Sequence, residues 1–274
     1  MRLYRNIILH LVATLISVAT YAQSGEITIL AHRGGCGEGM ENTLGTIRKS
    51  LDAGIKAFEI DLRITKDGTI VLQHDDTLKR TAGIERCVEE MTDKEVREIR
   101  LNDGSPLMFL DEFLNLMSKQ KGLYIEFELK CRKYSESQLF DSGYCDKVAK
   151  AVLAAQPKGS TYAITSFDTR ALRHIQSHYP TAEIGLITKS GCTKEVVDTA
   201  LSIGAIRIAA HLDKTSREGV QYAHTKGIKV NLWPGRSDET LLQAWALGAD
   251  IHCTDYPTRL TKYAKRHIKW LKTK

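Results

Sequence analysis

The sequence has little that would set it apart from an ordinary globular protein. Only five of its 274 residues are proline, 42% are hydrophobic and 26% are charged. These values exclude collagen-like, disordered and multi-span membrane proteins. They allow one or two domains, since a closed α/β barrel commonly takes about 250 residues as a single unit.

Near the N-terminus, the apolar run at positions 7–19 is shorter than the roughly 20 residues that a membrane-spanning helix needs. It follows Arg2 and Arg5 and precedes small residues around Ala22. This order is typical of a secretory signal. We therefore predict that residues 1–22 are a signal peptide and that the mature protein is exported, to the periplasm or outside the cell. An uncleaved anchor is the alternative.

The last thirteen residues contain no acidic side chain, although six cations stand there: Lys262, Lys265, Arg266, Lys269, Lys272 and Lys274. The formal net charge of the whole chain is +6, and it falls to +4 without Arg2 and Arg5. A nucleic-acid-binding protein spreads its cations over a face or along a groove, so no nucleic-acid partner is expected. We interpret residues 262–274 as a solvated final helix, or as a weak contact with an anionic membrane surface.

The six cysteines form no CxxC motif of the kind that binds zinc or exchanges disulfides. Disulfides persist in the oxidising compartments that exported proteins meet, but six cysteines allow 15 connectivities. Cys131 and Cys145 bracket a polar stretch and are the first candidates for a pair.

After Gly25, short β-rich runs alternate with amphipathic helical stretches to the end of the chain. We expect strands at 27–31, 57–64, 123–129, 162–165, 183–187, 205–209, 228–232 and 250–253. We expect helices at 44–53, 110–117, 145–155, 169–178, 194–201, 216–223, 239–247 and from 258 onward. This alternation predicts right-handed βαβ units and a parallel sheet.

The nucleotide-binding pattern GxGxxG is missing after the first expected strand, where an open doubly wound sheet would carry it. Eight repeats instead favour one α/β domain, a closed (β/α)8 TIM barrel over residues 25–274. Residues 75–106 break the rhythm, because Thr92-Asp93-Lys94-Glu95 is a capping box and Asn102-Asp103-Gly104 is a turn. We expect this segment to be a small excursion on the rim.

Polar residues gather where the expected strands end, which is where barrel enzymes build their active sites. They are His32 and Arg33 after the first strand, Glu59 and Asp61 in the second, His74 beyond it, and Glu126, Glu128 and Lys130 in and after the third. Glu59 and Asp61 share one face because they are two positions apart in a strand.

Ionised carboxylates that face the inside of a barrel are costly when they have no partner. A hard divalent cation would stabilise them, and oxygen ligands without cysteine favour Mg²⁺ or Ca²⁺ over Zn²⁺. The alternative is that Glu59 and Asp61 form structural ion pairs with Arg33 and Lys130. Two histidines on the same rim favour a metal-assisted reaction.

Several short motifs stand in a fixed order: His32-Arg33-Gly34, Glu41-Asn42-Thr43, Glu59-x-Asp61, Thr65-Lys66-Asp67-Gly68, His74-Asp75, Glu128-x-Lys130, Ser166-Phe167-Asp168, Trp233 and Thr254-Asp255-Tyr256-Pro257. Their order resembles the signature of the glycerophosphodiester phosphodiesterase family, and the resemblance covers residues 27–260. The chain departs from the family pattern in the glycine-rich loop at 35–40 and in the segment after Trp233. These departures leave the identity of the alcohol open.

The resemblance implies a role for each position. The implied metal ligands are Glu59, Asp61 and Glu128, the acid–base pair is His32 and His74, the phosphate-binding residues are Arg33 and Lys130, and the positioning residues are Glu41 and Asn42. Glu126 competes with Glu128 as third ligand, but the spacing of Glu128 to Lys130 matches the family. Trp233 would form one wall of the pocket that binds the glycerol or the head group. The alternative is that it is a core tryptophan.

The expected function is metal-dependent hydrolysis of small glycerophosphodiesters to sn-glycerol 3-phosphate and an alcohol. No Ser or Cys nucleophile stands among the rim residues of these motifs, so the substrate's own glycerol 2-hydroxyl is the simplest nucleophile. Its attack would leave a cyclic phosphate that water then opens, and the resemblance implies the same two-step course. Two alternatives stay open: a phospholipase acting on intact membrane lipids, and a catalytically inactive envelope-binding module on the same barrel.

Overall fold

The computed structural model describes residues 25–274, so the predicted signal peptide at 1–22 lies outside the described residues. Its cleavage stays a prediction, which N-terminal sequencing of the mature protein tests. None of the helices within 25–274 has the length and the apolar composition needed to cross a bilayer.

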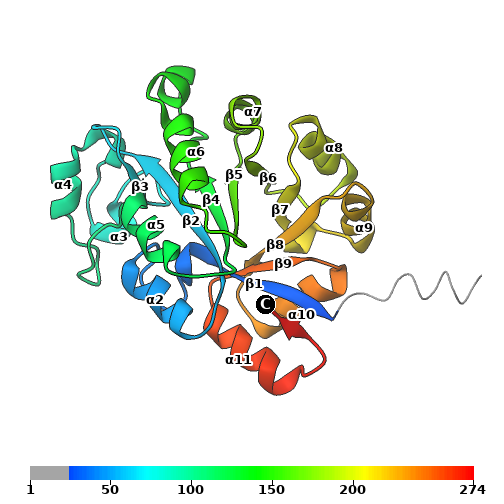
Figure 1. The fold of residues 1–274 in the computed structure, drawn as a ribbon. Coiled ribbons are helices and arrows are strands. Elements are labelled where there is room, and N and C mark those ends of the chain that lie inside the picture. The colour runs from blue at the N-terminus through cyan, green and yellow to red at the C-terminus, as the bar shows by residue number, and fades with distance from the viewer. Residues whose placement is uncertain (1–24) are drawn as a thin grey trace, which may run out of the picture.

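Eight parallel strands of the described chain close into a barrel, which confirms the predicted fold (Figure 1). They are β1 (Glu26–Ala31), β2 (Ala57–Ile64), β4 (Tyr124–Leu129), β5 (Thr161–Ser166), β6 (Glu183–Ile187), β7 (Arg207–His211), β8 (Lys229–Gly235) and β9 (Ile251–Thr254). Strand β1 pairs with β2 on one side and with β9 on the other, which closes the ring. The helices lie outside this ring (Figure 1).

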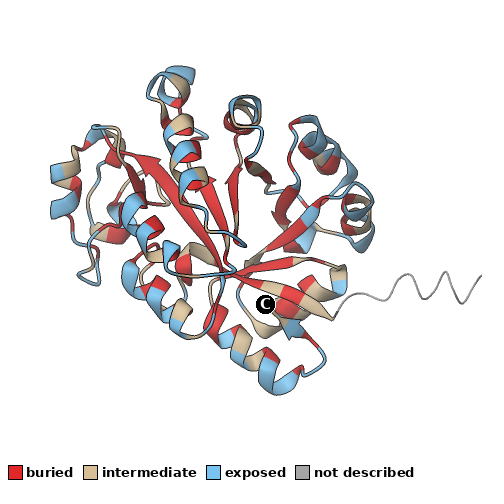
Figure 2. Cartoon of the chain, viewed as in Figure 1, coloured by how far each residue is buried: buried red, intermediate tan, exposed pale blue. Residues whose placement is uncertain are grey.

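The helices that cover the barrel are α2 (Leu44–Asp52), α5 (Leu110–Ser118), α6 (Tyr144–Ala155), α7 (Thr169–His178), α8 (Lys194–Ser202), α9 (Arg217–Thr225), α10 (Asp238–Leu247) and α11 (Pro257–His267). Several begin after a residue whose side chain accepts a hydrogen bond from the first turn, among them Thr43, Asp168 and Ser216. Such caps satisfy N–H groups that lack a partner inside the helix. Figure 2 shows the helices buried on the side that faces the strands and exposed on the other.

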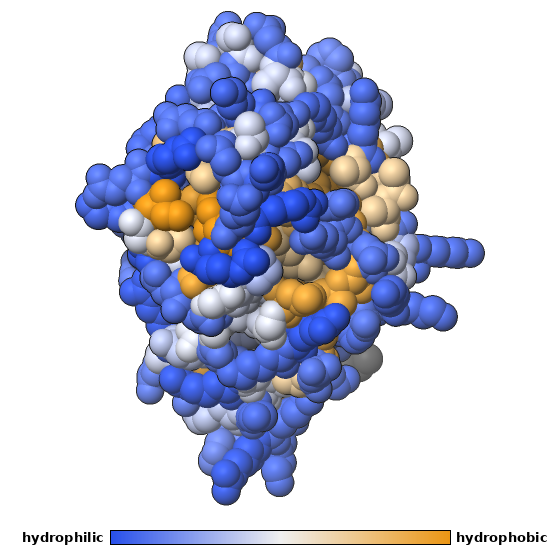
Figure 3. All heavy atoms as spheres, turned by 90° about the vertical axis from the view of Figure 1, so that its left-hand side faces the viewer, coloured by the Kyte–Doolittle hydropathy of each residue, from blue (hydrophilic) through white to orange (hydrophobic). Residues whose placement is uncertain are grey.

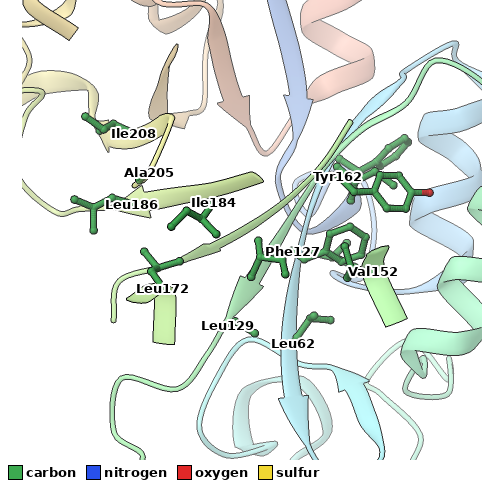
Figure 4. Close-up of a cluster of buried hydrophobic side chains, with 14 of the residues drawn as sticks. Leu62, Phe127, Leu129, Val152, Tyr162, Leu172, Ile184, Leu186, Ala205 and Ile208 are labelled. Atoms are coloured by element: carbon green, nitrogen blue, oxygen red, sulfur yellow. The ribbon is translucent and has the colours of Figure 1, made fainter. Parts of the chain in front are cut away.

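The apolar core lies between the strands and these helices. Strand β2 is buried along its whole length, as expected for a parallel strand that is covered on both faces. The ring of Phe127 packs edge-on against those of Tyr162 and Phe113, with centroids 5.2 and 6.0 Å apart. Leu62, Leu129 and the other labelled side chains extend this cluster (Figure 4). The packed layer fixes the strand register, and the register sets which side chains reach the rim.

Residues 75–106 follow β3 (Ile70–Leu72), a strand antiparallel to β2 that the sequence analysis did not anticipate. The segment contains α3 (Lys79–Ala82), η2 (Val88–Glu90) and α4 (Asp93–Glu98). Thr92 and Glu95 form the predicted capping box. Apolar side chains of the segment form a small cluster with Val71 and Phe109, so it is packed against the barrel. The face of the molecule that lies on the left in Figure 1 is mostly hydrophilic, with small separate apolar patches (Figure 3).

The largest departures from the expected bounds lie in β7, in β8 and in the C-terminal tail. Strand β7 runs from Arg207 to His211 rather than over 205–209, and Ile206, just before it, is 45% exposed. Strand β8 ends at Gly235 rather than at 232. The C-terminal tail is not one continuous helix, since α11 ends at His267 and β10 (Lys272–Thr273) pairs with the start of β1. The other short elements are η1 (His32–Gly34), η3 (Ser137–Asp141) and η4 (Leu212–Lys214).

The predicted disulfide between Cys131 and Cys145 is wrong. All six cysteines lie within the described residues and are free thiols, and these two are buried. The Sγ atom of Cys131 instead lies 3.6 Å from the carbonyl oxygen of Leu129 and 3.8 Å from Oγ of Ser166. The polar stretch between the two cysteines therefore indicated a loop and not a covalent link.

Candidate active site

The turn after β1 places the first polar side chains on the rim. Arg33 has a φ of +51°, in the left-handed region where non-glycine residues are uncommon. Such a conformation costs on the order of 1–3 kcal/mol and persists where the surroundings hold it. Here the backbone N–H of Arg33 donates to Oε2 of Glu59 at 2.9 Å. This bond ties the end of β1 to the carboxylates of β2.

Three buried carboxylates meet at the carboxyl ends of β2 and β4. Glu59 and Asp61 lie on one face of β2, and Asp61 stands opposite Glu128 in the register of β4. One oxygen atom of each residue lies within 4.8 Å of the other two, and the three residues are 4%, 0% and 7% exposed. Oε1 of Glu59 and Oδ1 of Asp61 are buried without a hydrogen-bond partner. The structure thus brings together the three acids that the sequence analysis singled out as metal ligands.

Two cations and one amide surround this cluster. Nζ of Lys130 lies 2.7 Å from Oε1 of Glu128 and 3.5 Å from Oδ1 of Asp61. Nε of Arg33 lies 3.6 Å from Oδ2 of Asp61, and Nδ2 of Asn42 donates to the same oxygen at 2.8 Å. Of the ion pairs considered as an alternative, those of Asp61 with Arg33 and Lys130 therefore exist, whereas within the described residues Glu59 forms an ion pair with neither cation.

The pKa values show which of the buried carboxylates the nearby cations stabilise and which they do not. Burial alone would raise the pKa of Asp61, but the positive charges of Lys130 and Arg33 and the hydrogen bond from Asn42 help to hold this pKa low. Burial raises the pKa of Glu59, and the negative charges of Asp61 and Glu128 raise it further. The cations thus leave one carboxylate poorly stabilised. Buried carboxylate oxygens without partners are the donors that a hard divalent cation takes, so the residues fit such an ion.

Both histidines are held through Nδ1 by a carboxylate. Nδ1 of His32 lies 2.6 Å from Oδ1 of Asp255, and Nδ1 of His74 lies 2.6 Å from Oδ1 of Asp75. Nε2 of His32 lies 4.0 Å from Oε2 of Glu59, so this ring faces the acidic cluster. Burial lowers the pKa of His74, which favours the neutral imidazole. A carboxylate on Nδ1 fixes the ring orientation and the tautomer, as proton transfer through Nε2 requires.

Sequence reasoning missed the orienting roles of Asp75 and Asp255, although both stand inside the motifs that it quoted. It missed Arg80 altogether. Nη1 and Nη2 of Arg80 each donate to Glu41 at 2.7 Å, and its Nε donates to Asp75 at 2.6 Å. Nη1 of Arg33 also donates to Glu41, at 3.2 Å. Residues 75–106 therefore contact the site through Asp75 and Arg80, and no local sequence pattern marks this arginine.

Glu126 and Trp233 have other partners than the three clustered acids. Glu126 accepts hydrogen bonds from the Tyr124 hydroxyl and from Nδ2 of Asn231, the latter at 3.0 Å, so Glu128 and not Glu126 joins Glu59 and Asp61. The ring of Trp233, at the end of β8, packs edge-on against Phe167 and His211, with centroids 6.1 and 5.5 Å apart. Trp233 is half-buried on the rim, which is compatible with a pocket wall.

The site has a definite chemical character. Cations beside the cluster suit an anionic substrate, unpartnered carboxylates suit a divalent cation, and two imidazoles held by carboxylates suit proton transfer. On a (β/α)8 barrel, this set defines a hydrolase of phosphoric esters. The sequence model of the glycerophosphoryl diester phosphodiesterase family matches residues 32–259. The chain belongs to this family and is accordingly a phosphoric diester hydrolase.

Individual relatives agree with this assignment. A glycerophosphodiester phosphodiesterase of Caldanaerobacter subterraneus is 25% identical over 245 residues, which are 87% of this chain and 98% of that protein. One from Bacillus altitudinis is 24% identical over 249 residues, 85% of this chain and 96% of that protein. Among solved structures, a phosphodiesterase of Oleispira antarctica is similar in fold, with a TM-score of 0.77 at 21% identity, covering 87% of this chain and 96% of that one.

We predict that Glu41→Gln lowers the free energy of unfolding by about 1–3 kcal/mol, because it removes a nearly buried charge that accepts hydrogen bonds from Arg33 and Arg80. Urea denaturation followed by circular dichroism measures the change. Glu85→Gln is the matched control, since Glu85 pairs with Lys79 on the surface, where both side chains are about two-thirds exposed. Surface pairs contribute little. Equal effects of the two substitutions would contradict the prediction.

Proposed function

We propose that this protein hydrolyses glycerophosphodiesters to sn-glycerol 3-phosphate and an alcohol, with the help of one divalent cation, Mg²⁺ or Ca²⁺. The observation that carries the proposal is the buried cluster of Glu59, Asp61 and Glu128 flanked by Arg33 and Lys130. Family membership supports the reaction class. The Oleispira antarctica phosphodiesterase is in complex with the product sn-glycerol-3-phosphate, which agrees with the proposed product.

In this proposal, Glu59, Asp61 and Glu128 hold the cation through their carboxylate oxygens, the donors that Mg²⁺ and Ca²⁺ prefer. When bound, the cation neutralises negative charge that builds up on the phosphate during the reaction. Arg33 and Lys130 bind the phosphate oxygens beside it. Nε of Arg33 is buried without a hydrogen-bond partner and is therefore able to donate to a ligand.

Glu41 and Asn42 are positioning residues in this proposal. Glu41 holds the guanidinium of Arg33, and Asn42 holds the carboxylate of Asp61. Asn42 does so from a left-handed conformation with a φ of +56°. Both residues therefore act on the groups that would touch the cation or the phosphate.

His32 and His74 are the proposed acid–base pair, oriented by Asp255 and Asp75. In the first step, one imidazole accepts the proton of the glycerol 2-hydroxyl while that oxygen attacks phosphorus, and the other imidazole, which enters the step protonated on both nitrogens, gives its Nε2 proton to the leaving alkoxide. The attack is intramolecular and so has a large proximity advantage over free water. A five-membered cyclic phosphate results. In the second step the two imidazoles exchange roles while water opens the ring.

We predict that a chelator abolishes activity, that Mg²⁺ or Ca²⁺ restores it, and that Glu59→Gln loses metal binding in isothermal titration calorimetry. Glu59 supplies one of the three carboxylates of the cluster. Glu126→Gln is the matched control, because Glu126 is equally buried but bonds to Tyr124 and Asn231. Full turnover in excess chelator, with no metal found by elemental analysis, would contradict the assignment of these residues as metal ligands.

We predict that an analogue of glycerophosphocholine without the 2-hydroxyl binds but turns over far more slowly, because it lacks the internal nucleophile. His32→Ala and His74→Ala should each lower kcat by about a hundredfold or more, as loss of a positioned acid or base does. His178→Ala is the control, since His178 is exposed on α7. Undiminished cleavage of the 2-deoxy analogue rules this route out and points to direct attack by water.

We predict that Trp233→Ala raises KM or shifts the preference for the alcohol, while metal affinity stays unchanged. Trp233 stands on the rim, and its ring packs against those of Phe167 and His211. Trp270→Ala is the control, because Trp270 is 56% exposed in the tail. If Trp233 is only a core residue, its replacement lowers thermal stability and leaves KM and selectivity as they are; thermal melts and steady-state kinetics separate the two.

The position of the C-terminal tail bears on the phospholipase alternative. Lys272 pairs with Glu26, the first residue of β1, whereas His32 follows the last residue of that strand. A strand of this length spans roughly 17–20 Å, so the end of the tail at Lys272 and the site lie at opposite ends of the barrel. An anionic membrane bound through residues 262–274 would therefore leave the site facing away from the lipid. We propose soluble glycerophosphodiesters, and not intact lipids, as the substrates.

The inactive-module alternative is disfavoured, because both imidazoles keep their orienting carboxylates and the three acids stay together. Turnover of glycerophosphocholine decides this point directly. A protein that binds glycerophosphocholine and never cleaves it, with any divalent cation, would be such a module.

We predict that the double variant Lys265→Glu and Lys269→Glu weakens sedimentation with vesicles that contain anionic lipid, and leaves the turnover of glycerophosphocholine unchanged. Both lysines are exposed in the tail. Each cation near an anionic surface contributes about 1 kcal/mol of attraction. Faster hydrolysis of the vesicle lipid than of glycerophosphocholine would favour the phospholipase instead.

A further inference from the structure

A second group of metal-ligand side chains stands behind His32, on the far side of its ring from the acidic cluster. One atom each of His32, Cys36 and Asp255 lies within 4.8 Å of the other two. Sγ of Cys36 is 3.6 Å from Nδ1 of His32 and 3.2 Å from Oδ1 of Asp255. All three residues are half-buried. We propose that this trio is an inhibitory binding site for Zn²⁺.

The backbone of the glycine-rich loop holds Cys36 in this place. The N–H of Cys36 donates to the carbonyl of His32 at 3.1 Å, and the N–H of Gly37 donates to the carbonyl of Asp255 at 2.8 Å. A Cβ atom on Gly37 would lie 2.5 Å from the ring of Tyr256, so the loop can approach this closely only with glycine there. The loop is thus bonded to the two segments that supply the other two ligands, and the thiol is positioned before any ion arrives.

The donor set and its spacing suit zinc. Tetrahedral zinc with bonds of about 2.0–2.3 Å places neighbouring sulfur, nitrogen and oxygen ligands about 3.4–3.6 Å apart. The two distances that involve Sγ of Cys36 are close to this range. Nδ1 of His32 and Oδ1 of Asp255, now 2.6 Å apart in a hydrogen bond, need to separate by about 0.8 Å. A thiolate and an imidazole select zinc, whereas the oxygen-only cluster on β2 and β4 selects Mg²⁺ or Ca²⁺.

The consequence for activity rests on the proposed role of His32 in proton transfer. When zinc binds, the S–H bond of Cys36 breaks, the sulfur lone pair binds the ion and the proton goes to solvent. The zinc-bound imidazole is neutral and carries its one proton on Nε2, because Nδ1 now binds zinc. Nε2 is the atom that faces the acidic cluster, 4.0 Å from Glu59. Carrying a proton, Nε2 has no lone pair with which to accept another. Each imidazole of the pair must accept a proton in one of the two proposed steps, so turnover stops.

The test uses the full-length mature protein saturated with the cation that supports its activity. Co²⁺ replaces Zn²⁺ as a spectroscopic probe, because cobalt bound to a thiolate shows a charge-transfer absorption in the near ultraviolet that carboxylate ligands do not give. We expect this absorption in the wild type and in Cys87→Ser, and its loss in Cys36→Ser. Cys87 is the matched control because it is another half-buried thiol, remote in sequence from the three ligands.

Zinc should also protect one thiol of the wild type from alkylation, identified as Cys36 by mass spectrometry, and should inhibit turnover of glycerophosphocholine. In Cys36→Ser the zinc concentration for half-inhibition should rise at least about tenfold, since even loss of an outer partner of a metal ligand lowers affinity about 10–100-fold. Cobalt absorption that persists in Cys36→Ser, or its absence in the wild type, overturns the site. Equal inhibition of the wild type and Cys36→Ser overturns the inhibitory role. A protein without any turnover contradicts the proposed function instead, because the absorption and the alkylation are read without substrate.

Discussion

Three carboxylates buried within 4.8 Å of one another are the constraint on which the rest of the rim depends. Like charges at this distance in a buried site repel strongly, and nearby cations reduce the repulsion without removing it. Other unusual features of the rim follow from that repulsion. Arg33 takes a left-handed conformation so that its N–H meets Glu59, and Asn42 takes another so that its amide meets Asp61. The backbone strain here is local, and it is held by the charges that it helps to stabilise.

The fold could be predicted from the sequence largely because its strands are covered on both faces. Such strands appear as short apolar runs, and the observed bounds of β2 and β6 are those predicted. The pairing of β10 with β1 could not be predicted, because a two-residue strand has no periodicity of its own. Its existence depends on where α11 ends in space. The free thiols of Cys131 and Cys145 show the same limit, since spacing along the chain does not give the direction of a side chain.

For the site, the alternation of side chains along a strand predicted on which face of the sheet each residue lies, but not which residues of the neighbouring strand lie beside it. Glu126 and Glu128 share a face, yet Glu126 lies level with Glu59 in the register and Glu128 lies level with Asp61. This difference of two positions is enough for Glu126 to form hydrogen bonds with Tyr124 and Asn231, while Glu128 forms an ion pair with Lys130. Arg80 was beyond sequence reasoning for a different reason. It reaches Glu41 from a segment that is packed on the barrel only through tertiary contacts.

Each imidazole is oriented by a carboxylate on its Nδ1 atom, but only one of the two carboxylates depends on closure of the barrel. The carboxylate that orients His74 belongs to the next residue, Asp75, and Arg80 donates a hydrogen bond to that carboxylate from outside the barrel. His32 finds its carboxylate on Asp255, 223 positions away, directly after β9. Only the pairing of β1 with β9 brings these two segments together. The last strand of the barrel is therefore a condition for orienting the histidine of the first, and an open sheet with the same strand sequences would keep the Asp75 pair and lose the Asp255 pair. The same closure brings the Cys36 loop against Asp255, so the catalytic geometry and the proposed zinc site have one structural cause.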